Sequence, residues 1–322
     1  MSVKSEYTYP EKIVIGTRGS ELAMWQANKV KSLIDNIGQN IDVTIRVITT
    51  SGDWRPEQGE VRLSADEGGK AQFAKEIEEA LLEGAVDIAV HSMKDMETDL
   101  PDGLVIPYML PRVDTRDAFL SDIAQNIEDL PMGSVVGTAS VRRQAFVLNK
   151  RPDLKIVPFR GNVGTRIEKL RAGQVDATFL AVAGLERLGM THEIASIIES
   201  ADMLPSVGQG AIGIEMRKGD RGKLSFISQI SCSETYACVE CERAVLRALS
   251  GSCHTPVGVL ATLNEGILGL SVAVVNPDGS QKWVEQVSKE FVDIDDAINL
   301  GHEVGGRLKS VVPPHILSDC GQ

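Results

Sequence analysis

The sequence GAVDIAV at residues 84–90 is matched by GQVDATF at residues 173–179. Each copy starts with a glycine after a helix-like stretch and continues into an apolar run, which is typical of a helix end that leads into a buried strand. A second matched pair is IGT at residues 15–17 and VGT at residues 136–138, each a strand end that opens onto a helix. The two pairs predict two similar α/β units, each with a largely parallel sheet.

Helix and strand signals surround these repeats. Residues 12–15 form a short apolar run that predicts a strand, and residues 41–49 alternate in the way a strand does. Between them, apolar residues recur at helical spacing from Ser20, a residue suited to cap a helix, to Gly38, a residue suited to end one. Asn162 is predicted to cap a later helix in the same way.

Changes in composition divide the chain into domains. Prolines mark two crossover segments, at residues 107–116 and 205–210. After about residue 230 the pattern becomes one helix, two or three antiparallel strands with turns at 264–266 and 276–279, and a last helix at about 295–309. We expect a cleft between the two α/β units. The predicted domains are 1–110 with 211–229, containing a lid loop at about 51–70, then 111–210, and then an α+β domain at 230–322.

Composition excludes several classes of protein. The formal net charge of −12 argues against a nucleic-acid partner. Residues 138–187 nevertheless hold ten lysines and arginines against four acids, which favours a small anionic ligand there. We find no apolar run long enough for a membrane span and no signal peptide at residues 1–11, so we expect a cytoplasmic protein.

Four of the five cysteines fall within 22 residues. Their odd number and the missing secretory signal disfavour a disulfide framework. A zinc site would draw on Cys232, Cys238, Cys241, Cys253 and His254, but only one short-spaced pair of ligands is present, so we expect no metal. Cys253 lies in a loop of small residues, where its thiol is either buried or open to alkylation.

Polar and cationic residues follow several predicted strands. Lys94 and Asp95 emerge after the strand at 84–90, either as a surface ion pair or as a carboxylate that stabilises a cation. Glycines, hydroxyl groups and arginines open the helices at 137–143 and 160–166, and Arg187 follows the strand at 173–179. Guanidinium groups and helix N–H groups both donate to oxyanions, so these segments predict a site for carboxylates or phosphates, although solvated arginines explain any one of them.

Together and in this order, these motifs resemble the porphobilinogen deaminase family from about Ile13 to the end of the chain. The stretches that carry the resemblance are GTRGS at 16–20, DIAVHSMKD at 87–95, DTRDAF at 114–119, RRQ at 142–144, RGNVGTR at 160–166, LAVAGL at 180–185 and VGQGA at 207–211.

The resemblance implies a fold of two α/β domains that resemble periplasmic binding proteins around a cleft, plus a small α+β domain. It also implies a monomeric transferase of tetrapyrrole and heme biosynthesis. In the family, a dipyrromethane cofactor is joined by a thioether to the cysteine that matches Cys253. The enzyme then deaminates and condenses four porphobilinogen molecules head to tail and releases hydroxymethylbilane and ammonia.

The resemblance also assigns site residues. Asp95 matches the catalytic carboxylate, which stabilises the cation that loss of ammonia leaves on the substrate. The matches to cofactor-binding positions are Cys253, Ser92, Lys94, Thr138, Ser140, Arg142, Arg143, Arg160, Gly161, Arg166 and Arg187. The matches to substrate-binding positions are Arg18, Ser20, Gln26, Arg160, Arg166 and Gln209, with Lys70 and Phe73 in the lid loop. The chain departs from the common family pattern at Asp66, Glu67, Ala71, Gln72, Ser250 and Ser252.

The duplication by itself equally suggests another class of protein. A noncatalytic two-domain clamp for a small organic anion would need the same arginines, but it would release no ammonia. That alternative stays open on the residues alone.

Overall fold

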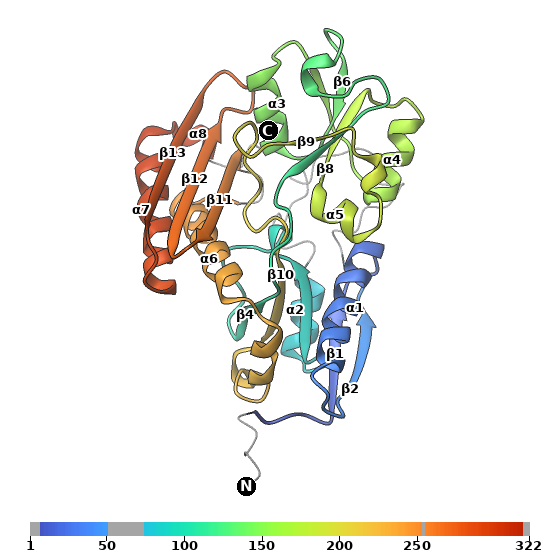
Figure 1. Cartoon of the computed structure of the whole chain (residues 1–322), viewed down its shortest axis with the longest axis vertical. Coiled ribbons are helices and arrows are strands. Elements are labelled where there is room, and N and C mark those ends of the chain that lie inside the picture. Colours follow the sequence, from blue (N-terminus) through green and yellow to red (C-terminus); the bar gives the residue numbers. More distant parts are fainter. Residues whose placement is uncertain (1–6, 51–73, 253–254, 318–322) are drawn as a thin grey trace. The chain divides into compact units, whose positions relative to one another are not determined.

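The computed structural model describes residues 7–50, 74–252 and 255–317. Contacts between Cα atoms group these residues into two compact units. The first unit contains residues 7–50, 74–112 and 211–236, and the second contains the other described residues. Figure 1 colours the elements of both units along the sequence.

The first unit is built on a five-stranded sheet with the order β2-β1-β3-β10-β4. Strand β10 is antiparallel to both of its neighbours, β3 and β4, whereas β1 is parallel to β2 and β3. The elements of this unit are β1 (Lys12–Thr17), α1 (Glu21–Asp35), β2 (Asp42–Val47), α2 (Lys75–Leu82), β3 (Ile88–Ser92), η3 (Met93–Asp95), β4 (Leu104–Met109), β10 (Ile212–Arg217), η6 (Lys218–Asp220) and η7 (Ser225–Ile230).

The second unit repeats this topology in a sheet with the order β7-β6-β8-β5-β9. Here β6 is parallel to β7 and β8, and β5 is antiparallel to β8 and β9. The elements are β5 (Asp117–Leu120), η4 (Ile127–Asp129), β6 (Val135–Gly137), α3 (Val141–Lys150), β7 (Lys155–Val157), α4 (Val163–Arg171), β8 (Ala177–Ala181), α5 (Val182–Arg187), η5 (Thr191–Glu193) and β9 (Ser196–Ile198). The matching strand orders confirm the predicted duplication.

The repeated sequence motif has the same physical role in both copies. Gly84 and Gly173 have φ values of +73° and +69°, a conformation that favours glycine, and each lies just after a helix. The aspartate three residues after each glycine links two strands. The Asp87 carboxylate, just before β3, accepts the Val14 N–H of β1 at 2.8 Å, and the Asp176 carboxylate, just before β8, accepts the Val135 N–H of β6 at 2.7 Å. The motif therefore ends a helix and sets the register of a parallel strand pair.

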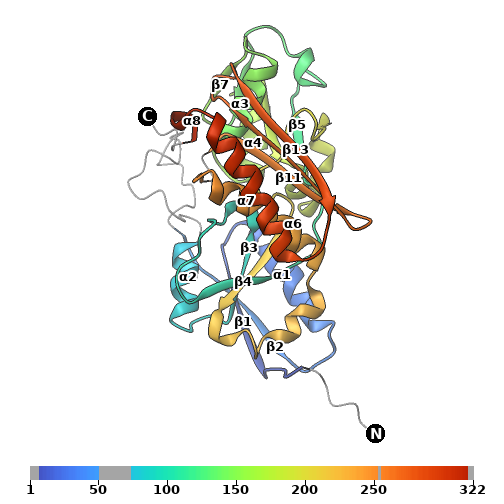
Figure 2. The same cartoon turned by 90° about the vertical axis from the view of Figure 1, so that its left-hand side faces the viewer.

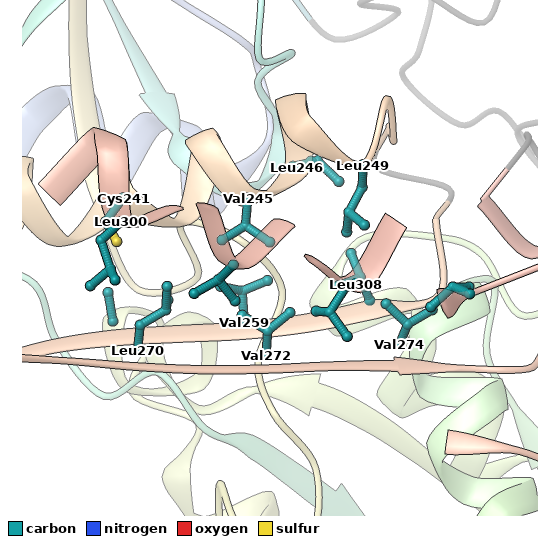
Figure 3. Close-up of a cluster of buried hydrophobic side chains, with 14 of the residues drawn as sticks. Cys241, Val245, Leu246, Leu249, Val259, Leu270, Val272, Val274, Leu300 and Leu308 are labelled. Carbon is teal, nitrogen blue, oxygen red and sulfur yellow. The ribbon is translucent and has the colours of Figure 1, made fainter. Parts of the chain in front are cut away.

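A third, antiparallel sheet with the order β11-β12-β13 also belongs to the second unit. Glu265 and Gly266 form its first turn, both with positive φ, as a two-residue hairpin of this kind requires. Helix α7 runs along the sheet (Figure 2), and helices α6 and α7 supply apolar side chains to one of its faces (Figure 3). The elements are α6 (Ser233–Ala248), β11 (Val257–Asn264), β12 (Ile267–Val275), β13 (Lys282–Glu290), α7 (Ile294–Val311) and α8 (Pro314–Leu317). Two α/β sheets and a small C-terminal α+β part confirm the predicted fold class.

Candidate active site

A pocket of the first unit lies where β3 ends and α1 begins. Five residues singled out in the sequence line it, namely Arg18, Ser20, Gln26, Ser92 and Asp95. His91 also lines the pocket, and no role was predicted for it. Lys94 is half-buried in η3 and is not among the residues that line the pocket. One guanidinium, two hydroxyl groups, one amide and one carboxylate are thus brought together.

Local interactions hold the walls of this pocket. The Ser20 Oγ caps α1 by accepting the Ala23 N–H at 3.3 Å, as its position in the sequence predicted. The buried Gln26 side chain donates from Nε2 to the Ser92 Oγ at 2.8 Å and so joins α1 to the end of β3. Met93 is buried beside Gly213, where a Cβ atom would meet its sulfur at 2.2 Å. This close approach to β10 fixes the turn that carries Asp95.

In the second unit, the predicted residues follow the carboxyl ends of three parallel strands, β6, β7 and β8. Because the strands are parallel, these ends share one edge of the sheet. Thr138 and Ser140 lie between β6 and α3, and the Ser140 Oγ caps α3 by accepting the Arg143 N–H. Gly161 lies between β7 and α4 with a φ of +124°. The Asn162 side chain caps α4 as predicted.

Two more arginines at this edge contact backbone carbonyl groups. Arg166 donates from Nε to the Gly161 carbonyl at 2.8 Å. Arg187, at the end of α5, donates to the Gly210 carbonyl at 2.7 Å, and burial lowers its pKa to about 10. Even at this lowered pKa, the Arg187 guanidinium stays charged at neutral pH.

Arg142 and Arg143 are buried against Asp117, a residue to which no role was assigned from the sequence. Each guanidinium donates to one carboxylate oxygen of Asp117 at 2.7 Å. The Gln209 side chain donates to the same carboxylate at 3.1 Å. Burial by itself disfavours the charged form of Asp117, but the two guanidinium groups outweigh it and hold the pKa of Asp117 well below its usual range.

This cluster carries one more positive than negative charge. The Nε atoms of Arg142 and Arg143 are buried and have no hydrogen-bond partner among the described residues. Donors and a surplus positive charge at a sheet edge lined with hydroxyl groups suit the acid side chains of a polyanionic ligand. The residues present therefore fit a cofactor that bears several carboxylates.

The cysteine cluster separates into distinct environments. Cys238 and Cys241 are buried in α6, and Figure 3 shows Cys241 in the apolar core beside α7. Burial raises the pKa of the Cys241 thiol to about 12, so this thiol is protonated at neutral pH. Within the described ranges, no three His, Cys, Asp or Glu residues are grouped so that they could hold a metal ion.

Several predicted residues lie outside the described residues, namely Cys253, His254, Lys70, Phe73, Asp66, Glu67, Ala71 and Gln72. Ser250, where the chain departs from the family pattern, is described. It has a φ of +53°, and its Oγ accepts a hydrogen bond from Lys309 Nζ at 2.6 Å. Ser250 therefore ties the segment before Cys253 to α7.

Sequence reasoning missed the charged residues that pair across long sequence distances. Asp117 is one of them, and Glu215, whose Oε2 lies 3.0 Å from the His91 Nε2, is another. A carboxylate in a strand of mostly apolar residues is the signal that marks both residues, since an acid is rarely buried without a partner.

Fold and site together define a duplicated α/β protein that binds an organic polyanion and sets one carboxylate in a pocket. Comparison with protein-family models matches residues 13–224 to "Porphobilinogen deaminase, dipyromethane cofactor binding domain" and residues 236–310 to "Porphobilinogen deaminase, C-terminal domain". The porphobilinogen deaminase of Nitrobacter hamburgensis is 49% identical over 297 residues, which cover 92% of each chain. The chloroplastic enzyme of Oryza sativa is 43% identical and covers 94% of this chain and 84% of its own.

Among solved structures, a putative methionine-binding lipoprotein of Bacillus subtilis is 13% identical with a TM-score of 0.42, covering 68% of this chain and 90% of its own. The chain belongs to the porphobilinogen deaminase family. It is a transferase of tetrapyrrole synthesis that condenses four porphobilinogen molecules on a dipyrromethane cofactor, and the noncatalytic alternative is set aside. The described helices include none that is both long and apolar enough to cross a membrane.

Proposed function

We propose that Asp95 is the catalytic carboxylate and that Cys253 carries the dipyrromethane cofactor. The observation that carries the first assignment is that Asp95 lines one pocket together with Arg18 and Ser20. A guanidinium beside hydroxyl groups binds the acid side chains of porphobilinogen, and this orients the aminomethyl group of the substrate toward the carboxylate.

The charge on Asp95 matches the change in charge during the reaction. When ammonia leaves, positive charge develops on the substrate, and an adjacent carboxylate stabilises that charge more than it stabilises the neutral pyrrole ring. The same carboxylate can accept a proton from a pyrrole N–H group. Arginine side chains can do neither, so Asp95 has a role distinct from that of the cationic residues around it.

The cofactor would supply, when bound, the pyrrole carbon to which each new unit is added. The residues proposed to hold it are Ser92, Lys94, Thr138, Ser140, Arg142, Arg143, Arg160, Gly161, Arg166 and Arg187. The residues proposed to bind substrate are Arg18, Ser20, Gln26, Arg160, Arg166 and Gln209, with Lys70 and Phe73 in the lid loop. The surplus positive charge around Asp117 supports the first set, because acid side chains would neutralise it.

Replacement of Asp95 tests the catalytic assignment. We expect Asp95→Asn to lower kcat by about 100-fold or more, because the amide keeps the shape of the side chain but loses its charge. Ammonia release by the purified holoenzyme is the assay, and Asp102→Asn, at an exposed position of the same unit, is the matched control. Activity of Asp95→Asn within about tenfold of wild type would contradict the role.

Intact-protein mass spectrometry tests the attachment of the cofactor. We expect the mass of the active enzyme to exceed that of the polypeptide by a dipyrromethane, and Cys253→Ser to show the bare polypeptide mass and no turnover. Cys232→Ser, at a half-buried cysteine, should keep the added mass. A bare polypeptide mass in active wild-type enzyme excludes a covalent cofactor.

Three broader assignments accompany the site. The domains are proposed as 1–110 with 211–229, 111–210 and 230–322, which the three separate sheets support. The protein is proposed to act as a cytoplasmic monomer without a nucleic-acid partner, in keeping with its net charge of −12. Light scattering during gel filtration tests the monomer, and a mass well above 34.8 kDa for the purified protein would contradict it.

A further inference from the structure

A buried charged cluster lies directly behind the pocket of the first unit. His91 belongs to both, because it lines the pocket while its Nε2 lies 3.0 Å from the Glu215 Oε2. Glu215 is fully buried in β10, and its other carboxylate oxygen has no hydrogen-bond partner among the described residues. Glu78 of α2 is buried and interacts electrostatically with Glu215 and His91. These three residues, Glu78, Glu215 and His91, are called the acid cluster below.

The acid cluster contains more potential negative charge than the imidazole can compensate. Two carboxylates in a buried space do not both ionise easily beside a single imidazole. Burial, followed by the charge of Glu215, raises the pKa of Glu78 to about 7. The acid cluster therefore gains one negative charge as the pH passes through neutrality.

Within the described part of the chain, the other charged groups around Glu78 do not cancel this charge. Glu97 and Glu79 are negative and raise the pKa of Glu78 further. Arg217 follows Glu215 on β10 by two residues, but its guanidinium donates to the carbonyl groups of Leu81 and Val86 and pairs with Asp87 and Asp220. Strands β1 and β3 also pack on α2, and the charged groups described on them are Lys12, exposed at the start of β1, and His91.

We infer that the acid cluster is a second source of negative charge for the reaction, acting through His91 from behind the pocket. This inference rests on the proposed role of Asp95, because it places extra charge behind the same developing cation. In their ionised state, Glu78 and Glu215 stabilise the positive charge that forms when ammonia leaves the substrate. They touch neither substrate nor cofactor and are positioning residues, which set the field and the orientation of the His91 ring.

The test compares kcat of the holoenzymes of wild type and Glu78→Gln between pH 6 and 8.5. Glutamine imitates the protonated acid, so the two enzymes should agree at pH 6, and wild type should be faster by about three- to tenfold at pH 8.5. KM should stay within about twofold, since the effect belongs to the transition state. Glu83→Gln, at the exposed C-cap of α2, is the matched control and should follow wild type at every pH.

Glu215→Gln provides a second variant for the same inference. It should lower kcat at both pH values, because the carboxylate beside His91 is lost whatever the state of Glu78. A ratio of wild-type to Glu78→Gln kcat that does not change with pH would overturn the inference, as would an equal response of Glu83→Gln. Failure of the Asp95 assignment would instead appear as activity retained in Asp95→Asn at every pH, so the two failures are distinguishable.

Discussion

Asp117→Asn is expected to destabilise the second unit strongly, because this carboxylate compensates two buried arginines. The Asp117 oxygens accept bonds at 2.7 Å from Arg142, 2.7 Å from Arg143 and 3.1 Å from Gln209. Asparagine keeps one acceptor oxygen but removes the charge. Two charge-assisted hydrogen bonds at about 1.5 to 3 kcal/mol each give a loss of about 3 to 6 kcal/mol. The cost of breaking a buried ion pair, about 3 to 5 kcal/mol, agrees with this range.

Urea unfolding at pH 7 measures this loss. The fluorescence of Trp283, which lies in β13 of the same unit, is one signal for the transition. Asp122→Asn, an exposed carboxylate close in sequence to β5, is the matched control and should change the free energy of unfolding by less than about 0.5 kcal/mol. We expect the midpoint of Asp117→Asn to fall with an unchanged dependence on urea.

The pH dependence of the same difference gives a second check. The pKa of Asp117 is depressed in the folded protein, so its contribution is fully present above the unfolded value of about 3.9 and is lost as the pH falls below it. The difference between wild type and Asp117→Asn should therefore stay constant from pH 7 to 5. A loss below about 1 kcal/mol at pH 7, or a difference that already vanishes by pH 5, would refute the reasoning.

Two further predictions concern stability. Burial raises the pKa of Glu78 from 4.5 to about 7. The contribution of the protonated Glu78 side chain to the free energy of unfolding is therefore fully present below pH 4.5 and is lost as the pH rises through 7. The difference of about 2.5 in pKa corresponds to a change of about 3 kcal/mol in the free energy of unfolding. Glu78→Gln should abolish this pH-dependent change. Equal slopes of unfolding free energy against pH in wild type and Glu78→Gln would contradict the prediction. Gly301→Ala should cost about 1 to 3 kcal/mol, because a Cβ atom would meet the Cys241 carbonyl oxygen at 2.2 Å and push α7 from α6. Its control is Gly306→Ala, where the Cβ atom meets open space and thermal unfolding should occur at the same or a higher temperature.

Local signals were sufficient to predict most of the fold. Ser20 and Asn162 cap α1 and α4 as expected, since a cap depends on residues only three positions apart. The repeated glycine and aspartate indicated the duplication for the same reason. The pocket was also predictable in part, because Arg18 and Asp95 follow neighbouring parallel strands, whose ends meet at one edge of the sheet.

Partners distant in sequence could not be predicted. Arg142 and Arg143 were predicted to bind a ligand, but their shared partner Asp117, about 25 residues earlier in the chain, was not predicted. Nothing in the local pattern around α3 reveals that β5 runs antiparallel beside β8 and carries a carboxylate to this point. Glu215 meets His91 across 124 residues for the same topological reason.

The two buried carboxylates, Asp117 and Glu215, share an origin in the topology. Each sheet contains one antiparallel strand, β5 or β10, that follows a crossover of the chain, and each of these strands carries one of the two acids. Their registers differ, because Glu215 pairs with Ala89 near the start of β3 whereas Asp117 pairs with Ala181 at the end of β8. Asp117 therefore lies at the edge where the arginines gather and compensates them, while Glu215 lies deeper and reaches the pocket through His91. The two copies of the duplicated sheet therefore differ in electrostatic role. The sheet edge near Asp117 has a surplus of positive charge, whereas Glu215 and Glu78 place negative charge behind the pocket that contains Asp95.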